Sequence, residues 1–326
     1  MLTAPPAQKN PAVRRLLVAQ LPADFADWLD FVATGTLLAF VWQVQPHAYA
    51  MLAAGMALPY LIVGPFAGAM VDRLPIRPVL AGSNLGRGIA TALLFLAPNW
   101  QIMIALVALR CTLDSFFTPG KQAALQCLTT GADRASAIGL SQAINHMSKL
   151  ISPVIGGSLL ALISPGALFL INALLSLGAA LLCLRLGQLP KAATDLGPKP
   201  GLFAEVSAGL AEVWSNPLLR FTIAMFAAQF FAIFLYDAFF APLLAQMGLT
   251  EFHFGLSLGA VGCGGLIGSL LFGFAKDLRR PFLWASAGLP LAAARRSSWV
   301  GPACSPARLT CRFCWAFSQH SASAGR

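Results

Sequence analysis

Residues 64–78 read Gly-Pro-Phe-Ala-Gly-Ala-Met-Val-Asp-Arg-Leu-Pro-Ile-Arg-Pro, and they stand between two long apolar segments. Small residues such as Gly68 let two membrane helices approach each other closely. Asp72, Arg73 and Arg77 follow as the first dense group of charges after the N-terminus. Charges gathered in a short loop between apolar segments are typical of a membrane surface, so the stretch predicts a loop between two membrane-spanning helices.

A related stretch occurs later in the chain, where Gly273 precedes Asp277, Arg279 and Arg280. A motif that recurs in corresponding places of two halves is expected of a duplicated transporter fold. The two stretches together therefore predict an all-α polytopic membrane protein with two related halves.

The composition supports a membrane protein. The 326 residues are 57% hydrophobic and only 10% charged, and the mean hydropathy is +0.72. A soluble domain would carry roughly 25% charged residues. The net charge of +10 comes mostly from short loops beside apolar segments, which indicates the positive-inside pattern of membrane proteins and not nucleic-acid binding. The scattered cysteines favour helix packing, with no disulfide framework and no metal site.

The apolar segments predict how the chain crosses the membrane. A spanning helix needs about 20 apolar residues, which gives roughly eight spans. Their approximate ranges are 16–44, 47–70, 79–96, 100–125, 138–163, 166–186, 218–246 and 254–275. Lys and Arg are found before the first span and after the even-numbered spans, so we expect a cytoplasmic N-terminus in a bacterial inner membrane.

The chain divides into four regions by composition. Residues 1–186 predict a six-helix transmembrane bundle, and residues 187–216 a cytoplasmic interfacial linker that contains an amphipathic helix. Residues 217–290 predict a partial second bundle. Residues 291–326 contain no Asp, Glu or Lys and are rich in Arg, Ser, Ala and Cys. We expect this last region to be a disordered tail translated from a shifted reading frame.

The eighth expected span carries many glycines. They are Gly255, Gly259, Gly262, Gly264, Gly265 and Gly268. Small residues every three or four positions predict tight contact with another helix. Because further spans of the second bundle are not evident in the sequence, we expect this glycine face to meet lipid or another protein.

The first expected span holds three carboxylates, Asp24, Asp27 and Asp30. At ~100° per residue they occupy one face of a helix. A charged residue in a span costs about 2.5–3.5 kcal/mol, so this face should point into the protein. A cation- or proton-binding site would account for the arrangement. A polar network between helices, with Asp30 near the outer surface, is the alternative.

Other charged residues occur in later spans. Arg110 and Asp114 are four residues apart on the fourth span, a spacing that permits an ion pair within one helix. Lys149 lies in the fifth span and Asp237 in the seventh. A carboxylate that exchanges a cationic partner for a proton can serve as a proton relay, whereas a permanent ion pair is the structural alternative for each residue.

These motifs resemble the major facilitator superfamily, and in particular its drug:proton antiporters, which include macrolide efflux proteins and the enterobactin exporter. The segment Pro153-Val-Ile-Gly156-Gly157, preceded by Ser152, is similar to the Gly-Pro-x-x-Gly-Gly antiporter motif. The resemblance implies that Asp72 and Arg73 close a cytoplasmic gate against the second half, and that Gly68 permits close packing there. It also implies that two bundles rock around a central site, and that this sequence holds the first bundle with two to three helices of the second.

The resemblance implies a proton-driven exporter of a small amphipathic compound, such as a drug or a siderophore-like molecule. Its energy source would be the proton gradient, with no cofactor, and its partners would be its substrate, protons and the bilayer. We expect the full-length protein to be a monomer. The alternative is a membrane remnant that does not transport and serves only in assembly. We expect no enzymatic activity, because the sequence shows no nucleophile–base set and no nucleotide-binding loop in its solvent-facing segments.

Overall fold

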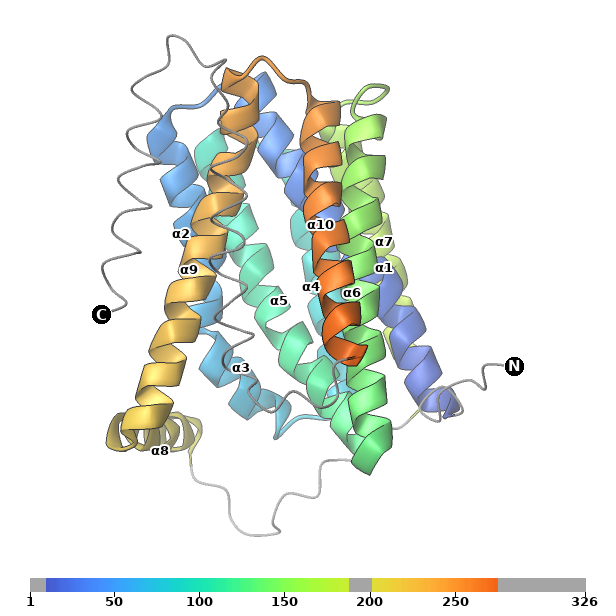
Figure 1. The fold of residues 1–326 in the computed structure, drawn as a ribbon, viewed down its shortest axis with the longest axis vertical. Coiled ribbons are helices and arrows are strands. Elements are labelled where there is room, and N and C mark those ends of the chain that lie inside the picture. Colours follow the sequence, from blue (N-terminus) through green and yellow to red (C-terminus); the bar gives the residue numbers. More distant parts are fainter. Residues whose placement is uncertain (1–9, 188–200, 275–326) are drawn as a thin grey trace. The chain divides into compact units, whose positions relative to one another are not determined.

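The computed structural model describes residues 10–187 and 201–274, and every regular element in these two ranges is a helix (Figure 1). The elements are α1 Pro11–Thr36, the π-helical turn η2 Leu37–Val41, α2 Pro46–Ile62, α3 Gly64–Val71, α4 Ile76–Leu94, α5 Trp100–Leu128, α6 Gly131–Leu159, α7 Pro165–Leu184, α8 Leu202–Ser215, α9 Pro217–Gln246 and α10 Glu251–Phe274. The expected spans fall on these helices, the first on α1 and η2 and the second on α2 and α3, and the all-α prediction is confirmed.

The helix ends follow from local sequence. Asn side chains begin three of the long helices: those of Asn10, Asn99 and Asn216 accept hydrogen bonds from the first backbone amides of α1, α5 and α9. The second expected span is divided at Val63 into α2 and α3. By length and apolar composition, four helical segments of the described ranges can cross a membrane: Pro46–Val71, Trp100–Leu128, Pro165–Leu184 and Pro217–Gln246.

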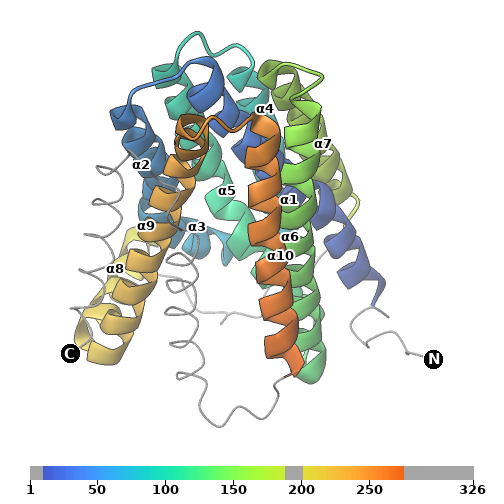
Figure 2. The same cartoon turned by 45° about the horizontal axis from the view of Figure 1, so that its top comes forward.

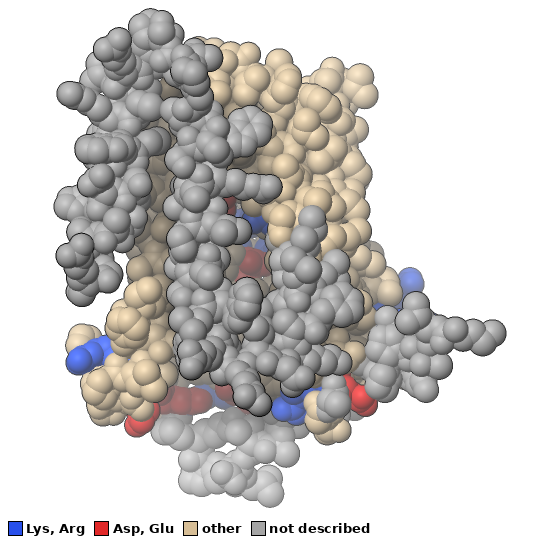
Figure 3. Space-filling view, in the orientation of Figure 1, with Lys and Arg blue, Asp and Glu red and all other residues tan. Residues whose placement is uncertain are grey.

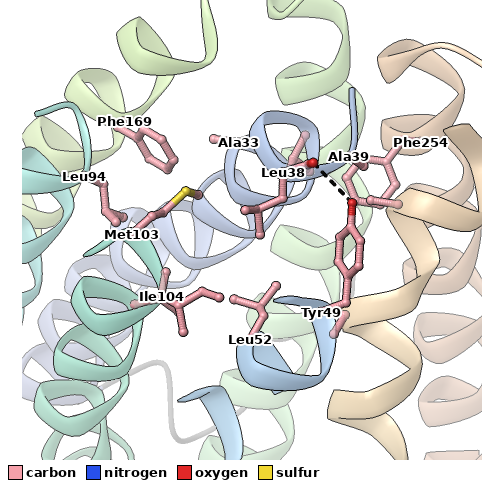
Figure 4. Packing of buried hydrophobic residues seen from close by; sticks show 14 of the residues in the cluster. Ala33, Leu38, Ala39, Tyr49, Leu52, Leu94, Met103, Ile104, Phe169 and Phe254 are labelled. Carbon is pink, nitrogen blue, oxygen red and sulfur yellow. Dashed lines mark hydrogen bonds between the residues drawn. The ribbon is translucent and has the colours of Figure 1, made fainter. Parts of the chain in front are cut away.

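The helices between residues 11 and 184 form a bundle around α1. Helix α1 packs on α6 and α7, α4 packs on α5 and α7, and α2 packs on α5 and α9. The bundle contains two clusters of buried apolar side chains. One includes Leu38, Met103 and Phe169 (Figure 4), and the other includes Leu80 and Leu125. The two clusters lie at opposite ends of the same helices, and the buried charges lie between them.

The glycine face of α10 packs against α6, and the two helices run side by side in both views of the ribbon (Figures 1 and 2). A Cβ atom on Gly255 would overlap the carbonyl oxygen of Pro153. A Cβ atom on Gly259 would lie 3.0 Å from the carbonyl oxygen of Leu150. At Gly255 and Gly259 the expectation that this face meets lipid or another protein is therefore wrong, because the backbone of α6 fills the space there. A Cβ atom on Gly264 would meet no described atom within 4 Å.

Two further expectations concern Gly68 and the second copy of the loop motif. A Cβ atom on Gly68 would meet no described atom within 4 Å, so the described residues do not make the close packing expected there. Gly273 lies in α10, but Asp277, Arg279 and Arg280 lie outside the described residues, as do positions 291–326 and most of the linker before α8.

Candidate functional site

The three aspartates of α1 all point into the bundle, as their spacing predicts. Asp24 and Asp30 are each 2% exposed, and the side chain of Asp27 is 28% exposed. Asp30 is therefore buried inside the bundle; its depth relative to the outer membrane surface stays a prediction. Because a buried charge is costly unless it is paired, the identity of the partners decides what this face can do.

Asp27 binds two arginines at once, Arg87 of α4 and Arg110 of α5. Arg87 also reaches Asp114, with 2.7 Å between Nη1 and Oδ1. Arg110 also reaches Asp30, with 2.6 Å between Nε and Oδ2. The two arginines therefore link carboxylates of α1 to a carboxylate of α5.

The ion pair within α5 that the spacing of Arg110 and Asp114 permits is not among the ion pairs of the described residues. Each side chain turns to an opposite charge on a neighbouring helix: Arg110 turns to α1 and Asp114 to Arg87 of α4. The sequence spacing permitted the contact within the helix, but the packing of α1 and α4 beside α5 offers each group a partner across the interface.

Arg87 was missed in the sequence, although it is fully buried and central to the site. The signal was present, because Arg87 is an ionisable residue inside an apolar span and such residues mark functional positions. Tyr60 of α2 was missed as well. Its hydroxyl donates to Oδ2 of Asp114 at 2.5 Å, and its ring stacks on Phe234 of α9 at 5.9 Å between centroids. Nothing in the sequence around Tyr60 distinguished it from an ordinary apolar-span tyrosine.

Asp24 belongs to a second set of contacts nearer the start of α1. Lys121 of α5 lies 3.8 Å from its carboxylate. Gln20 donates to the same carboxylate at 2.6 Å and Asn145 of α6 donates at 3.3 Å. The ring of Phe117 lies between the two sets, 5.4 Å from the Lys121 ammonium and 5.4 Å from the Arg87 guanidinium.

We call the connected charged groups the ionic layer. Its members are Asp24, Asp27, Asp30, Arg87, Arg110, Asp114 and Lys121. The layer lies between the two apolar clusters of the bundle and so near the middle of the helices. In Figure 3 charged side chains are visible deep between the helices as well as at the end of the molecule where α8 lies.

Lys149 and Asp237 lie apart from the ionic layer. The ammonium of Lys149 lies 4.4 Å from the centre of the Trp28 ring of α1, a cation–π contact. Asp237 of α9 acts on Lys149 of α6 electrostatically. These two candidates therefore form a separate pair of charges between the first bundle and the helices that follow α8.

The antiporter-like segment lies in α6, and its residues contact the helices on two sides of α6. A Cβ atom on Gly156 would lie 3.0 Å from Leu29 of α1, and one on Gly157 would lie 3.0 Å from the backbone of Gly255 in α10. The hydroxyl of Ser152 donates to the carbonyl of Phe25 in α1 at 2.7 Å. The segment thus holds α6 close to α1 and to α10 at once.

The loop motif at residues 68–77 contacts the amphipathic linker helix. Arg73 forms an ion pair with Glu205 of α8, and the ring of Phe66 meets the ring of Phe203 edge-on at 5.5 Å. Asp72 caps α3, and Arg77 lies in the first turn of α4. The closure of a gate against the second bundle stays a prediction.

The described part of the site contains charged side chains but no metal-binding cluster. In the described ranges, no group of three or more His, Cys, Asp or Glu side chains could hold a metal ion. Each carboxylate of the ionic layer forms an ion pair with an arginine or a lysine instead, and two of them share Arg87.

Long apolar helices that enclose a layer of charges in mid-bundle are typical of membrane transporters, where charges at that depth often line the path of an ion or a substrate. Residues 16–321 match the Major Facilitator Superfamily, and the chain belongs to that family.

Two relatives and one solved structure show the similarity. An MFS-type transporter of Bacillus subtilis (strain 168), YfiS, is 31% identical over 159 residues, which are 48% of this chain and 38% of that protein. Macrolide efflux protein A of Enterococcus faecalis is 25% identical over 242 residues, 71% of this chain and 74% of that protein. A bacterial homologue of the human lysosomal transporter Spinster, solved in an inward-facing conformation, shares the fold with a TM-score of 0.60 at 18% identity over 82% of this chain and 63% of that one. The match to the Bacillus protein thus covers well under half of its length.

Proposed function

We propose that this transporter exports a small amphipathic compound in exchange for protons, by alternating access. The observation that carries the proposal is the charge balance of the ionic layer. Among the described residues, the ion pairs of Asp24, Asp27, Asp30 and Asp114 are with Arg87, Arg110 and Lys121, so the ionic layer holds one more carboxylate than cations. A buried carboxylate without a matching cation favours the bound proton that neutralises it.

Asp27 is the group that takes up this proton. Its side chain is the most exposed of the three on α1, and one of its oxygens faces both arginines. Protonation of Asp27 frees Arg87 to bind Asp114 alone and Arg110 to bind Asp30 alone. Such an exchange of partners changes the contacts among α1, α4 and α5, and it gives the proton a structural effect.

The substrate class rests on the relatives and on the aromatic surroundings. One relative is a macrolide efflux protein, and several aromatic rings of α9 meet the first bundle, among them Phe234 on Tyr60 and Phe239 on Tyr49. Aromatic faces with few charges suit a bulky amphipathic molecule. We assign Lys149 and Asp237 as the charged groups that face the bound substrate.

The proposal is tested with the full chain in proteoliposomes. We would impose a pH gradient and follow the transport of rhodamine 6G and of a macrolide, with and without a protonophore. The wild type should transport in response to the gradient. Asp27→Asn should lose this response and keep exchange of substrate between two equal pools, because exchange needs no proton.

The matched control is Asp133→Asn, which removes an acid from the first turn of α6, outside the ionic layer. This variant should respond to the gradient like the wild type. An equal response from Asp27→Asn would contradict the proposal. Failure of the folded wild type to transport or exchange either compound would favour the non-transporting alternative.

We also propose an inner-membrane location with a cytoplasmic N-terminus. Lys and Arg are found before the first span and after the even-numbered spans, and this distribution supports the orientation by the positive-inside rule. Labelling of single cysteines placed at Ser215 and at Asn99 should show only the first to be reached from the cytoplasm.

A further inference from the structure

Lys149 of α6 and Asp237 of α9 carry opposite charges that attract each other without contact. In the described ranges neither side chain forms an ion pair or a hydrogen bond, and the Lys149 ammonium lies instead on the face of the Trp28 ring. Every carboxylate of the ionic layer, in contrast, has a cationic partner. Because an unpaired charge inside a membrane helix is costly, two charges that stay apart there are expected to face water or a ligand.

The two charged side chains and the Trp28 ring are also accessible. All three are half-buried, whereas Asp24, Asp30 and Arg87 of the ionic layer are buried. A molecule can therefore reach Lys149, Asp237 and Trp28 without displacing a packed side chain.

These groups lie below the point where α1, α9 and α10 meet. A Cβ atom on Gly35 of α1 would lie 3.2 Å from the Cβ atom of Ala241 in α9 and 2.8 Å from the ring of Phe254 in α10. Toward the end where α8 lies, Asp237 follows one turn from Ala241 and Trp28 two turns from Gly35. In the same direction α9 and α6 diverge in both views of the ribbon (Figures 1 and 2).

Aromatic rings connect this meeting point to Trp28. The ring of Phe31 lies 6.0 Å from that of Trp28 and 6.3 Å from that of Phe254, between centroids. Phe240 of α9 lies 5.9 Å from Phe254. The two charges are therefore bordered by an aromatic wall that suits the apolar body of a ligand.

We propose that Lys149 and Asp237 bind an amphipathic zwitterion, a molecule with one anionic group, one cationic group and an apolar or aromatic body. The anionic group binds the Lys149 ammonium, the cationic group binds the Asp237 carboxylate, and the body lies on the aromatic wall that begins at Trp28. A molecule with a single charge would leave one of the two protein charges unpaired, whereas a zwitterion pairs both. That the bound molecule is exported rests on the proposed function, but its binding does not.

The test compares three forms of one fluorescent probe. Nε-dansyl-lysine carries an ammonium and a carboxylate, its methyl ester carries only the ammonium, and its Nα-acetyl derivative carries only the carboxylate. Binding is measured by equilibrium dialysis of the full chain in detergent micelles, with protein-free micelles subtracted and no pH gradient. The wild type should bind the zwitterion about tenfold more tightly than either analogue, because each analogue loses one charge-assisted contact.

Single variants assign each charge of the probe to a side chain. Lys149→Gln should bind the zwitterion and its methyl ester equally, and Asp237→Asn should bind the zwitterion and its Nα-acetyl derivative equally. These ratios are taken within one preparation, so they do not depend on how much of a variant is folded. The matched control, Asp133→Asn, removes a charge from the first turn of α6 and should keep both wild-type ratios.

Three outcomes would overturn the inference. They are a wild type that binds either analogue as tightly as the zwitterion, a folded wild type that binds none of the three probes, and variants of Lys149 and Asp237 that keep the wild-type ratios. If the ratios are as expected but a pH gradient drives no transport, the proposed function fails and the zwitterion site stands. Transport driven by the gradient without these ratios would leave the proposed function in place and remove the zwitterion site.

Discussion

Arg87 and Arg73 each join two helices through a carboxylate, but at very different depths. Arg87 is fully buried and serves both Asp27 and Asp114. Arg73 and Glu205 keep 26% and 35% of their side chains exposed where α3 meets α8. A buried group left without its partner is costly, whereas an exposed ion pair is screened by water and salt. We therefore expect the ion pairs of Arg87 to contribute much more to the stability of the bundle than the ion pair between Arg73 and Glu205.

The largest effect should come from Arg87→Ala. It leaves Asp27 and Asp114 with one arginine fewer in the buried layer, which should lower the free energy of unfolding by about 3–5 kcal/mol. The loss would be measured as a shift of the unfolding transition in detergent. Arg87→Lys keeps the charge and should recover part of the stability. An Arg87→Ala protein as stable as the wild type would show that depth does not set the strength of the contact.

Tyr60→Phe removes a neutral hydrogen-bond donor to Asp114 of the ionic layer and tests whether a large loss of stability requires the loss of a charge. Oδ2 of Asp114 loses its hydrogen bond, which should cost about 1.5–3 kcal/mol because the acceptor is charged. Tyr49→Phe is the matched control, because the Tyr49 hydroxyl donates to a backbone carbonyl, that of Leu38, at 3.2 Å (Figure 4). A larger loss in the control would contradict the prediction.

Gly255→Ala tests burial without any polar group. Its methyl would overlap the backbone of α6, so the helices must separate, at a cost of about 1–3 kcal/mol. Gly264→Ala adds the same methyl where no described atom lies within 4 Å, and it should leave the unfolding transition in place. Equal transitions for the two variants would mean that α10 does not rest on α6 in the membrane.

The smallest effect should come from Glu205→Gln. Loss of the exposed pair with Arg73 should cost about 0–1 kcal/mol, and the difference from wild type should shrink further at high salt. Glu212→Gln changes an acid on the same helix and is the control. A loss comparable to that of Arg87→Ala would break the contrast between the two arginines.

Periodicity was sufficient to predict the fold and the inward face of α1. The helix ranges follow from apolar length, and Asp24, Asp27 and Asp30 share a face because a helix turns ~100° per residue. The partners could not be predicted, because they depend on how far α4 and α5 are shifted along α1. The same limit applies to the glycine face of α10, where the sequence indicates close packing but does not identify α6.

Gly156 and Gly157 are neighbours in the chain, yet one faces α1 and the other faces α10. At this level only the thickness of one peptide backbone separates Leu29, the neighbour of Asp30, from Gly255. A rotatable side chain between two helices can accommodate a small displacement of one helix by changing its rotamer. Because no such side chain lies between them here, we expect a sub-ångström shift of α10 to reach Leu29, beside Asp30, almost undiminished.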